Sequence, residues 1–332
     1  MTNKFAVILP VYNGGTLVKE CVDSILAQSY QHFNLIVLDN RSDDGTLEWL
    51  NSLKDDRIII HSSEVKLSIE QNWARIKEIE KNEFITLIGH DDILLPGYLE
   101  EMNNLIEKHP QASLYQTHFS FIDAAGNFKS NCKPMTEIQH AHEFLTAQFT
   151  LNIDSTGTGY MMRSKDYDQV GGISPAYPNL IYADFQLWVQ LTLKSYKATS
   201  NKLCFKYRVH DSASRLTNGE QYQVAFEKYA HFISALCKSN EDVKSVVEAY
   251  GHKMLMQTLE GLSHRLLKTP MNLRKIKIKE LVVKFNEYAS DWIPGQQFKP
   301  LSKFRIWIAV VLDQNAVGRR IFNVYKGIKH AN

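Results

Sequence analysis

The 332-residue sequence lacks the segments and motifs that mark several common classes of protein. It has no GxGxxG after its first apolar strand and no GxxxxGK[ST], so neither a dinucleotide loop nor a Walker-type phosphate loop is predicted. Its four cysteines are widely spaced without a CxxC pair, which favours reduced thiols over disulfides or zinc. The apolar run IWIAVVL at 306–312 is too short to span a bilayer. Since no cleavage site follows the apolar N-terminal strand, we expect no secretory signal and a cytoplasmic location.

Charge is nearly balanced overall but unevenly distributed along the chain. The formal net charge is +2, yet residues 270–332 hold twelve Lys or Arg and only four Asp or Glu. Such an asymmetry is typical of a basic tail that meets an anionic partner.

Strand and helix signals alternate in the first half of the chain. Apolar, β-branched runs are separated by segments whose apolar residues have helical spacing, and these runs lie near 5–11, 33–39, 57–61 and 84–88. Repeated strand–helix units predict an α/β fold with a mostly parallel sheet. Right-handed crossovers then place the ends of the first, second and fourth strands, with Tyr12, Asp39 and Asp91, on one rim.

The second half of the chain has a different pattern. Strand and helix signals are mixed after residue 127, and only helical periodicity remains beyond about residue 218. We therefore predict an α/β domain at 1–218 and a helical C-terminal region at 219–332. One of the predicted helices covers NLRKIKIKELVVKFNEYA at 272–289.

Two adjacent carboxylates, Asp91 and Asp92, follow the buried fourth strand in FITLIGHDD. Capping of the next helix explains one acid but not both. Mg²⁺ and Mn²⁺ sites that serve nucleotide substrates often use one or two carboxylates and complete the coordination with diphosphate oxygens. The pair therefore predicts a divalent-metal site at the carboxyl end of the sheet, where open α/β folds bind ligands.

Polar residues also follow the first two strands. Asp39 ends the second strand, where a carboxylate can accept hydrogen bonds from the edge of a base. In the turn that follows, capping of the next helix by Asp44 or Thr46 is at least as good an explanation as ligand binding. In PVYNGG, Pro10 is expected to end the sheet, and Tyr12 offers a ring for stacking.

Asp184 and His210 are the remaining candidates. Asp184 begins an amphipathic helix, where an acid can be the N-cap and can also be held ionised for general-base chemistry. His210 ends a strand among hydroxyl residues, and a lone histidine of this kind is more often structural than a ligand.

In this order, the elements resemble the family 2 glycosyltransferases, which are inverting enzymes of the GT-A fold that use sugar nucleotides. The resemblance covers residues 4–216 and includes P-x-Y-N, D-x-x-S-x-D-G-T, a helix with an Asn, an acid opening ADFQLW, and Y-R-x-H-x-x-S-x-S. The residues that carry it are Pro10, Tyr12, Asn13, Asp39, Ser42, Asp44, Gly45, Thr46, Asn72, Asp184, Tyr207, Arg208, His210, Ser212 and Ser214.

The resemblance implies a metal-dependent transferase that moves one sugar from a nucleotide sugar, with UDP expected, to a hydroxyl of a glycan or lipid-linked acceptor. A role in bacterial surface polysaccharide synthesis would follow. It implies Asp184 as the base and Asp91 as a ligand of Mn²⁺ or Mg²⁺, together with Asp92 and His210. The nucleotide-binding residues that it implies are Pro10, Val11, Tyr12, Asn13, Asp39, Asn40, Ser42, Ser68, Asn72 and His90.

Two positions depart from the family pattern. Gly89 replaces the first acid of D-x-D, and Ala183 replaces a Glu that usually precedes the base. A non-catalytic GT-A module that binds a nucleotide or a partner transferase therefore stays open as an alternative. A nucleotidyltransferase is disfavoured, because no glycine-rich basic loop follows the first strand. The Q/R-x-x-R-W element and the membrane helices of processive synthases are also missing, which favours single addition.

The C-terminal segment 299–332 leaves two interpretations open. It combines many apolar residues, among them Trp307 and Tyr325, with seven basic residues and one acid. These residues could pack onto the rest of the protein or form a contact in a homo-oligomer. Alternatively, the segment could lie on the anionic inner face of the cytoplasmic membrane, near a lipid-linked acceptor. Nucleic acid is not an expected partner.

Overall fold

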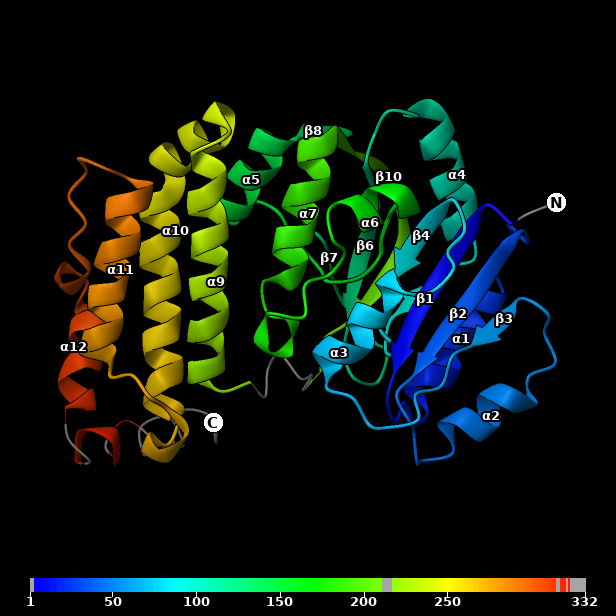
Figure 1. Ribbon diagram of the computed structural model, residues 1–332, viewed down its shortest axis with the longest axis horizontal. Helices are drawn as coiled ribbons and strands as arrows, with labels where there is room; N and C mark the ends of the chain where they lie inside the picture. The colour runs from blue at the N-terminus through cyan, green and yellow to red at the C-terminus, as the bar shows by residue number, and fades with distance from the viewer. Residues whose placement is uncertain (1–2, 211–216, 315–316, 321, 323–332) are drawn as a thin grey trace. The chain divides into compact units, whose positions relative to one another are not determined.

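The computed structural model describes residues 3–210, 217–314, 317–320 and 322 (Figure 1). The chain divides into two compact units. Unit 1 comprises residues 1–144, 151–176 and 183–212, and unit 2 comprises 145–150, 177–182 and 213–332. The roles predicted for the regions on either side of residue 218 stay predictions.

One mixed sheet forms the centre of unit 1, in the order β3-β2-β1-β4-β9-β6-β10-β5, with β7 beside β6 and β8 beside β10. The strands are β1 (Phe5–Val11), β2 (Phe33–Asp39), β3 (Ile58–Ile60), β4 (Phe84–Leu87), β5 (Ile93–Leu94), β6 (Leu114–Ile122), β7 (Phe128–Asn131), β8 (Ile138–His140), β9 (Tyr160–Arg163) and β10 (Tyr196–Arg208). The predicted α/β fold with a largely parallel sheet is confirmed for β1 to β4.

Helices flank this sheet and make up most of unit 2 (Figure 1). The earlier helices are α1 (Leu17–Leu26), α2 (Thr46–Ser52), α3 (Ile69–Ala74), α4 (Tyr98–Lys108), α5 (Ala141–Thr150), α6 (Ser164–Gln169) and α7 (Ala183–Lys194). The later helices are α9 (Gly219–Cys237), α10 (Glu241–Lys268), α11 (Ile278–Trp292) and α12 (Phe304–Asp313).

Strand register places the predicted site residues on one rim. β1 runs parallel to β2 with Val11 opposite Asp39, and parallel to β4 with Ile8 opposite Leu87. The loops that follow these three strands therefore leave the same edge of the sheet, as the sequence pattern predicts.

Pro10 does not end the first strand, contrary to the expectation from the sequence. β1 continues to Val11, and Pro10 lies opposite Leu38 of β2. The carbonyl of Ile8 accepts from the N–H of Ile88, so alternate residues of β1 face β4. Since the pairing with β4 stops at Ile8, the missing N–H of Pro10 leaves no strand partner unsatisfied.

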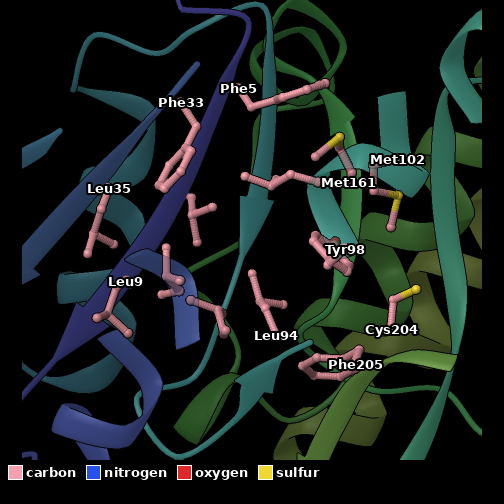
Figure 2. Close-up of a cluster of buried hydrophobic side chains, with 14 of the residues drawn as sticks. Phe5, Leu9, Phe33, Leu35, Leu94, Tyr98, Met102, Met161, Cys204 and Phe205 are labelled. Carbon is pink, nitrogen blue, oxygen red and sulfur yellow. The ribbon is translucent and has the colours of Figure 1, made fainter. Parts of the chain in front are cut away.

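The core of unit 1 fixes the sheet beneath this rim. All seven residues of β1 are buried, which is the pattern of a central strand covered on both faces. Figure 2 shows side chains from β1, β2, β5, α4, β9 and β10 gathered in one apolar cluster. Each large side chain that is fully buried stabilises the fold by roughly 1.5–3 kcal/mol. The rim is thus carried by a well-packed scaffold.

Unit 2 contains the four later helices, with α10 in contact with α9, α11 and α12. The helix predicted at 272–289 begins later, at Ile278. Arg274 has extended backbone, and its buried guanidinium pairs with the buried carboxylate of Asp313. The extended backbone at Arg274 separates the short 3-10 helix Met271–Leu273 from α11. In the part of the chain that the structure describes, no helix is long and apolar enough to cross a membrane.

Candidate active site

The loop after β1 is held by the turn after β2. The backbone N–H of Asn13 donates to Ser42 Oγ at 3.0 Å, and Asn13 and Asp43 exchange two further hydrogen bonds. Gly45, and not Asp44, is the N-cap of α2. The carboxylate of Asp44 accepts from the N–H groups of Gly15 and Thr46. The polar turn therefore serves first to shape the loop that contains Tyr12.

Three residues predicted to bind the nucleotide use their side chains within the protein. Asn40 makes two hydrogen bonds with the backbone of Leu67, at 2.9 and 2.8 Å. Asn72 donates to the carbonyl of Leu38 at 3.1 Å. Ser68 is the N-cap of α3 and forms a capping box with Gln71. These contacts position the rim and leave any contact with a nucleotide untested.

Asp39 and Tyr12 lie at the ends of the neighbouring strands β2 and β1. Asp39 is fully buried, and its two oxygens accept from the N–H of Ser42 at 3.3 Å. Tyr12 is half-buried, and Lys66 Nζ lies 2.6 Å from its hydroxyl and 4.1 Å from its ring centroid. Arg75, which sequence reasoning missed, donates to the carbonyl of Asp39 at 3.1 Å and to Asn72 Oδ1 at 2.9 Å. Its spacing of three residues from Asn72 on a helix was the available signal.

Asp91, which follows β4, and His210, which follows β10, are in contact on the other half of the rim. His210 Nε2 and Asp91 Oδ2 are in direct hydrogen-bond contact, and the two side chains are 24% and 19% exposed. His90, beside them, is half-buried, and burial lowers its pKa. Ser212 and Ser214 lie outside the described residues.

Asp92, predicted as a metal ligand, is instead 2% exposed and engaged within the fold. Its Oδ2 accepts from the hydroxyl of Thr158 at 2.6 Å, and its Oδ1 accepts from the N–H of Arg208 at 2.9 Å. Burial, followed by the neighbouring charge of Asp91, raises the pKa of Asp92 well above its usual value. Both oxygens are thus occupied in joining the ends of β4 and β10, which favours a structural role for this acid.

Gly89 explains the conformation of Asp91. A Cβ at position 89 would lie 2.6 Å from Asp91 Oδ1 and 3.3 Å from Asp92 Oδ2. The missing side chain therefore gives room for the carboxylate of Asp91 to fold back over the glycine. Beneath it, Cys21 Sγ donates to the carbonyl of Gly89 at 3.4 Å, and burial raises the pKa of this thiol.

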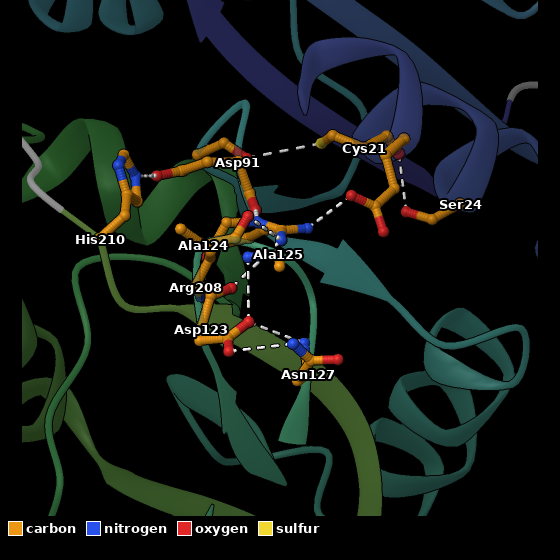
Figure 3. Close-up of polar contacts among 12 residues, drawn as sticks. Cys21, Ser24, Asp91, Asp123, Ala124, Ala125, Asn127, Arg208 and His210 are labelled. Atoms are coloured by element: carbon orange, nitrogen blue, oxygen red, sulfur yellow. Dashed lines mark hydrogen bonds and ion pairs between the residues drawn. The ribbon is translucent and has the colours of Figure 1, made fainter. Parts of the chain in front are cut away.

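Arg208 is the centre of the polar network in Figure 3. Its side chain is 1% exposed and forms an ion pair with Glu20 of α1 at 2.5 Å. It also donates to the carbonyl of Asp91 at 2.7 Å and to the carbonyls of Asp123 and Ala124 at 3.3 and 3.1 Å. Arg208 was noted from the sequence only as part of a motif, and Glu20 carried no signal because its partner is 188 residues away.

Asp184 is the second residue of α7 and is not its N-cap. Burial raises its pKa to about 6, although the N–H groups of Phe185 and Asp184 lower it. The expectation that the helix N-terminus holds this acid ionised is therefore incomplete, because desolvation is the larger effect. An acid with this pKa is suited to accept a proton near neutral pH.

A short loop connects Asp184 with the acids after β4. A Cβ at Gly157 would lie 3.6 Å from Asp184 Oδ2, so this glycine lies beside the carboxylate. The next residue, Thr158, donates to Asp92 as described. On the other side, the carbonyl of Thr156 accepts from Trp188 Nε1 of α7 at 3.0 Å. The loop therefore ties α7 to the end of β4.

The described residues around Asp91 do not form a complete metal site. No group of three or more His, Cys, Asp or Glu side chains suited to a metal occurs among the described residues. Asp91 and His210 nevertheless place an oxygen and a nitrogen in contact, on side chains that are 19% and 24% exposed. Two protein ligands suit a Mg²⁺ or Mn²⁺ ion whose remaining ligands are water and substrate phosphates.

Comparison with known proteins identifies the family. The sequence model of Glycosyl transferase family 2 matches residues 6–171, half of the chain. The chain belongs to glycosyltransferase family 2. The match covers β1 to β9 and ends before Asp184 and His210.

Curated relatives of this glycosyltransferase share low identity with it. Glycosyltransferase GlyG of Streptococcus pneumoniae is 27% identical over 130 residues, which are 39% of this chain and 43% of that protein. The chain thus spans less than half the length of this relative. The GalNAc(5)-diNAcBac-PP-undecaprenol beta-1,3-glucosyltransferase of Campylobacter jejuni is 24% identical over 331 residues, 91% of this chain and 98% of that protein.

Solved structures show the same fold. S. aureus TarS 1–349 in complex with UDP-GlcNAc has a TM-score of 0.62 at 13% identity and covers 93% of this chain and 90% of that one. Mannosyltransferase PcManGT from Pyrobaculum calidifontis, in complex with GDP-Man and Mn²⁺, has a TM-score of 0.53 at 12% identity, with 97% and 87% covered. The predicted GT-A fold, with its helical C-terminal region, is confirmed.

Proposed function

We propose that this family 2 enzyme transfers one sugar, with inversion, from a UDP-sugar to a hydroxyl of a lipid-linked glycan. The observation that carries the proposal is Asp184, a half-buried acid with a pKa of about 6 that a short loop ties to the rim bearing Asp39 and Asp91. The choice of UDP is supported by the TarS complex, and the choice of acceptor by the Campylobacter relative, whose name specifies a polyprenyl diphosphate glycan.

The chemistry follows from the ionisation of Asp184. With a pKa of about 6 the carboxylate is mostly ionised at pH 7, yet it is basic enough to accept the proton of an acceptor hydroxyl. The hydroxyl oxygen bonds to the anomeric carbon from the face opposite the nucleotide. The bond from that carbon to the β-phosphate oxygen breaks, and UDP leaves with the electron pair.

Asp91 and His210 would hold the divalent ion, whose chemistry is Lewis-acid stabilisation of the diphosphate that leaves. The ion bound in PcManGT is Mn²⁺, which supports the choice of Mn²⁺ or Mg²⁺. Asp92 supports Asp91 from the neighbouring position through its contacts with Thr158 and Arg208.

Asp39 and Tyr12 would contact the base. Asp39 ends the strand beside β1 with a buried carboxylate, and Tyr12 presents its ring at the same rim. Pro10, Val11 and Asn13 fix the loop between them. Ser42, Asn40, Asn72 and His90 complete the proposed nucleotide-binding rim, and Ser68 supports it by capping α3. The proposed reaction takes place in the cytoplasm, at the inner face of the membrane that holds the acceptor.

A donor panel tests the proposal. The full chain is incubated with UDP-, GDP- and dTDP-sugars, Mn²⁺ and a polyprenyl diphosphate glycan, and the released nucleotide is measured together with thermal shift. We expect UDP release that depends on the acceptor and is lost in Asp184→Asn, while the thermal shift by the donor remains. Donor binding without nucleotide release under any condition would identify a non-catalytic GT-A module instead.

A further inference from the structure

Helix α12 of unit 2 has an inner face that packs into the bundle. Its buried residues are Ile306, Ala309 and Asp313, which recur at intervals of three and four and so lie on one side of the helix. The helix contacts α10 and α11 within the same unit.

The opposite side of α12 is apolar and exposed. Phe304, Trp307 and Val311, here called the outer stripe, are 66%, 48% and 41% exposed. Their spacing of three and four residues also places them on one side, and at 100° per residue that side is opposite the inner face. The rings of Phe304 and Trp307 lie 5.9 Å apart. An ordinary surface helix has polar residues in these positions.

The outer stripe cannot be buried by rotating the helix at low cost. Asp313, at the end of the inner face, is paired with the buried guanidinium of Arg274 and accepts from the N–H of Ile278 at 2.9 Å. Rotation would break this buried ion pair and leave both charges buried without a partner. The fold thus holds the apolar stripe outward.

The sequence segment that contains the stripe has more basic than acidic residues. Between residues 299 and 320 the sequence has five Lys or Arg, and its single acid is the buried Asp313. Lys303 and Arg305 share Glu260 as a partner, at 2.6 and 2.9 Å. Lys299 and Arg320 are exposed.

We propose that the outer stripe of α12 and its flanking basic residues bind an anionic phospholipid bilayer. A ten-residue helix is too short to span it, but a Phe–Trp stripe beside positive charge suits the interface between headgroups and acyl chains. The purpose of the contact rests on the proposed function, because the lipid-linked acceptor would lie in that bilayer. Ile321, Val324 and Tyr325, also predicted to contribute, lie outside the described residues.

Sedimentation with vesicles tests the surface independently of catalysis. The full chain is mixed with vesicles of phosphatidylcholine alone or with 30% phosphatidylglycerol. We expect binding to the anionic vesicles only, with release at high salt. The triple variant Phe304→Ser/Trp307→Ser/Val311→Ser should bind at least tenfold more weakly, and Lys299→Glu/Arg320→Glu about tenfold more weakly at low salt.

Two controls separate membrane contact from misfolding. Phe128→Ser removes a side chain that is equally exposed, at 66%, on β7 of unit 1, and it should leave vesicle binding unchanged. Trp307→Phe keeps the stripe apolar, so it should bind vesicles normally but lose the part of the fluorescence quenched by brominated acyl chains. UDP-sugar binding should be unchanged in every variant.

Three outcomes would overturn the proposal. The first is no binding of the full chain to anionic vesicles at any salt concentration. The second is equal binding by the triple variant and the native chain. The third is a dimer in solution that the triple substitution dissociates, which would make the stripe a contact between copies. Since donor turnover is measured separately, none of these outcomes would bear on the transferase assignment.

Discussion

The two halves of the rim are built from different chemistry. Around β1 and β2, neutral side chains bond to backbone, Ser42 to Asn13, Asn40 to Leu67 and Asn72 to Leu38, across 27 to 34 residues of sequence. Asp39, Asp43 and Asp44 also accept hydrogen bonds there, but they are left out of the contacts here called the neutral half. Around β4 and β10, charged groups meet across 116 to 188 residues, with Arg208 at the centre. The neutral half can form as soon as consecutive strands pair, whereas the charged half closes only when β10 joins the sheet.

This difference predicts unequal costs of substitution. A neutral hydrogen bond contributes about 1 kcal/mol net, so each contact in the neutral half is replaceable. Removing the partner of a buried charge lowers the free energy of unfolding several times more. Substitutions in the charged half should therefore reduce both stability and turnover. The predictions below run from the largest expected effect to the smallest.

Asp184→Asn should reduce turnover by at least about 10²-fold, the contribution of a general base. Donor affinity should stay near normal, because Asp184 is assigned to the acceptor proton. Steady-state kinetics and calorimetry with the UDP-sugar measure the two effects. Near-native turnover would show that Asp184 is not the general base.

Asp91→Ala and Asp92→Ala should differ in kind although the residues are adjacent. Asp91→Ala should abolish metal-dependent donor binding with little effect on stability, since its side chain is 19% exposed. Asp92→Ala should destabilise unit 1 by about 2–4 kcal/mol, because it leaves Thr158 and the N–H of Arg208 without their acceptor. Calorimetry with and without Mn²⁺, and thermal unfolding, separate them. If the two variants lost donor binding equally and were equally stable, Asp92 would be a metal ligand like Asp91.

Glu20→Gln should weaken the apparent Mn²⁺ affinity by about tenfold, the cost typical of losing a residue that orients a metal ligand. Glu20 pairs with the guanidinium of Arg208, which also donates to the carbonyl of Asp91. The readout is the Mn²⁺ concentration for half-maximal turnover. Glu48→Gln, in the first turn of α2, is the control, and a similar shift in both variants would contradict the positioning role.

The pH dependence should reflect Asp184. Turnover should rise as pH increases through about 6 and then level off, because the base must be ionised. Stability should change in the opposite direction. The folded-state pKa of Asp184 is above its ordinary 3.8, so burial of the ionised form destabilises the protein above pH 6 by up to about 3 kcal/mol, and not below pH 3.8. Asp184→Asn should therefore be more stable than the native chain only at the higher pH, and a constant difference would contradict the shifted pKa.

Ser68→Ala should have the smallest effect, about 1 kcal/mol of stability, as for other N-cap residues. Its hydroxyl accepts from the N–H of Gln71 at 3.2 Å. Donor affinity of the folded protein should be unchanged. A fall in affinity larger than the fall in stability would show that Ser68 also contacts the nucleotide, as the family resemblance implies.

The sequence was sufficient for the features that depend on local pattern. Apolar runs located β1, β2 and β4, and crossover handedness put Tyr12, Asp39 and Asp91 on one rim, because both rules act over one strand–helix unit. The partners of Asp92 and Arg208 could not be predicted, since they depend on where a strand more than a hundred residues later is inserted. Pro10 was misread for the same reason: its tolerance depends on where β4 stops.

The space at Gly89 bears on what would happen if the acid of the family pattern were introduced at that position. An aspartate introduced there would put its Cβ 2.6 Å from Asp91 Oδ1, so Asp91 would have to swing away and release His210. A side chain at position 89 and the present rotamer of Asp91 are therefore incompatible. Gly89→Asp alone should therefore not simply add a ligand, because it also displaces Asp91 from His210.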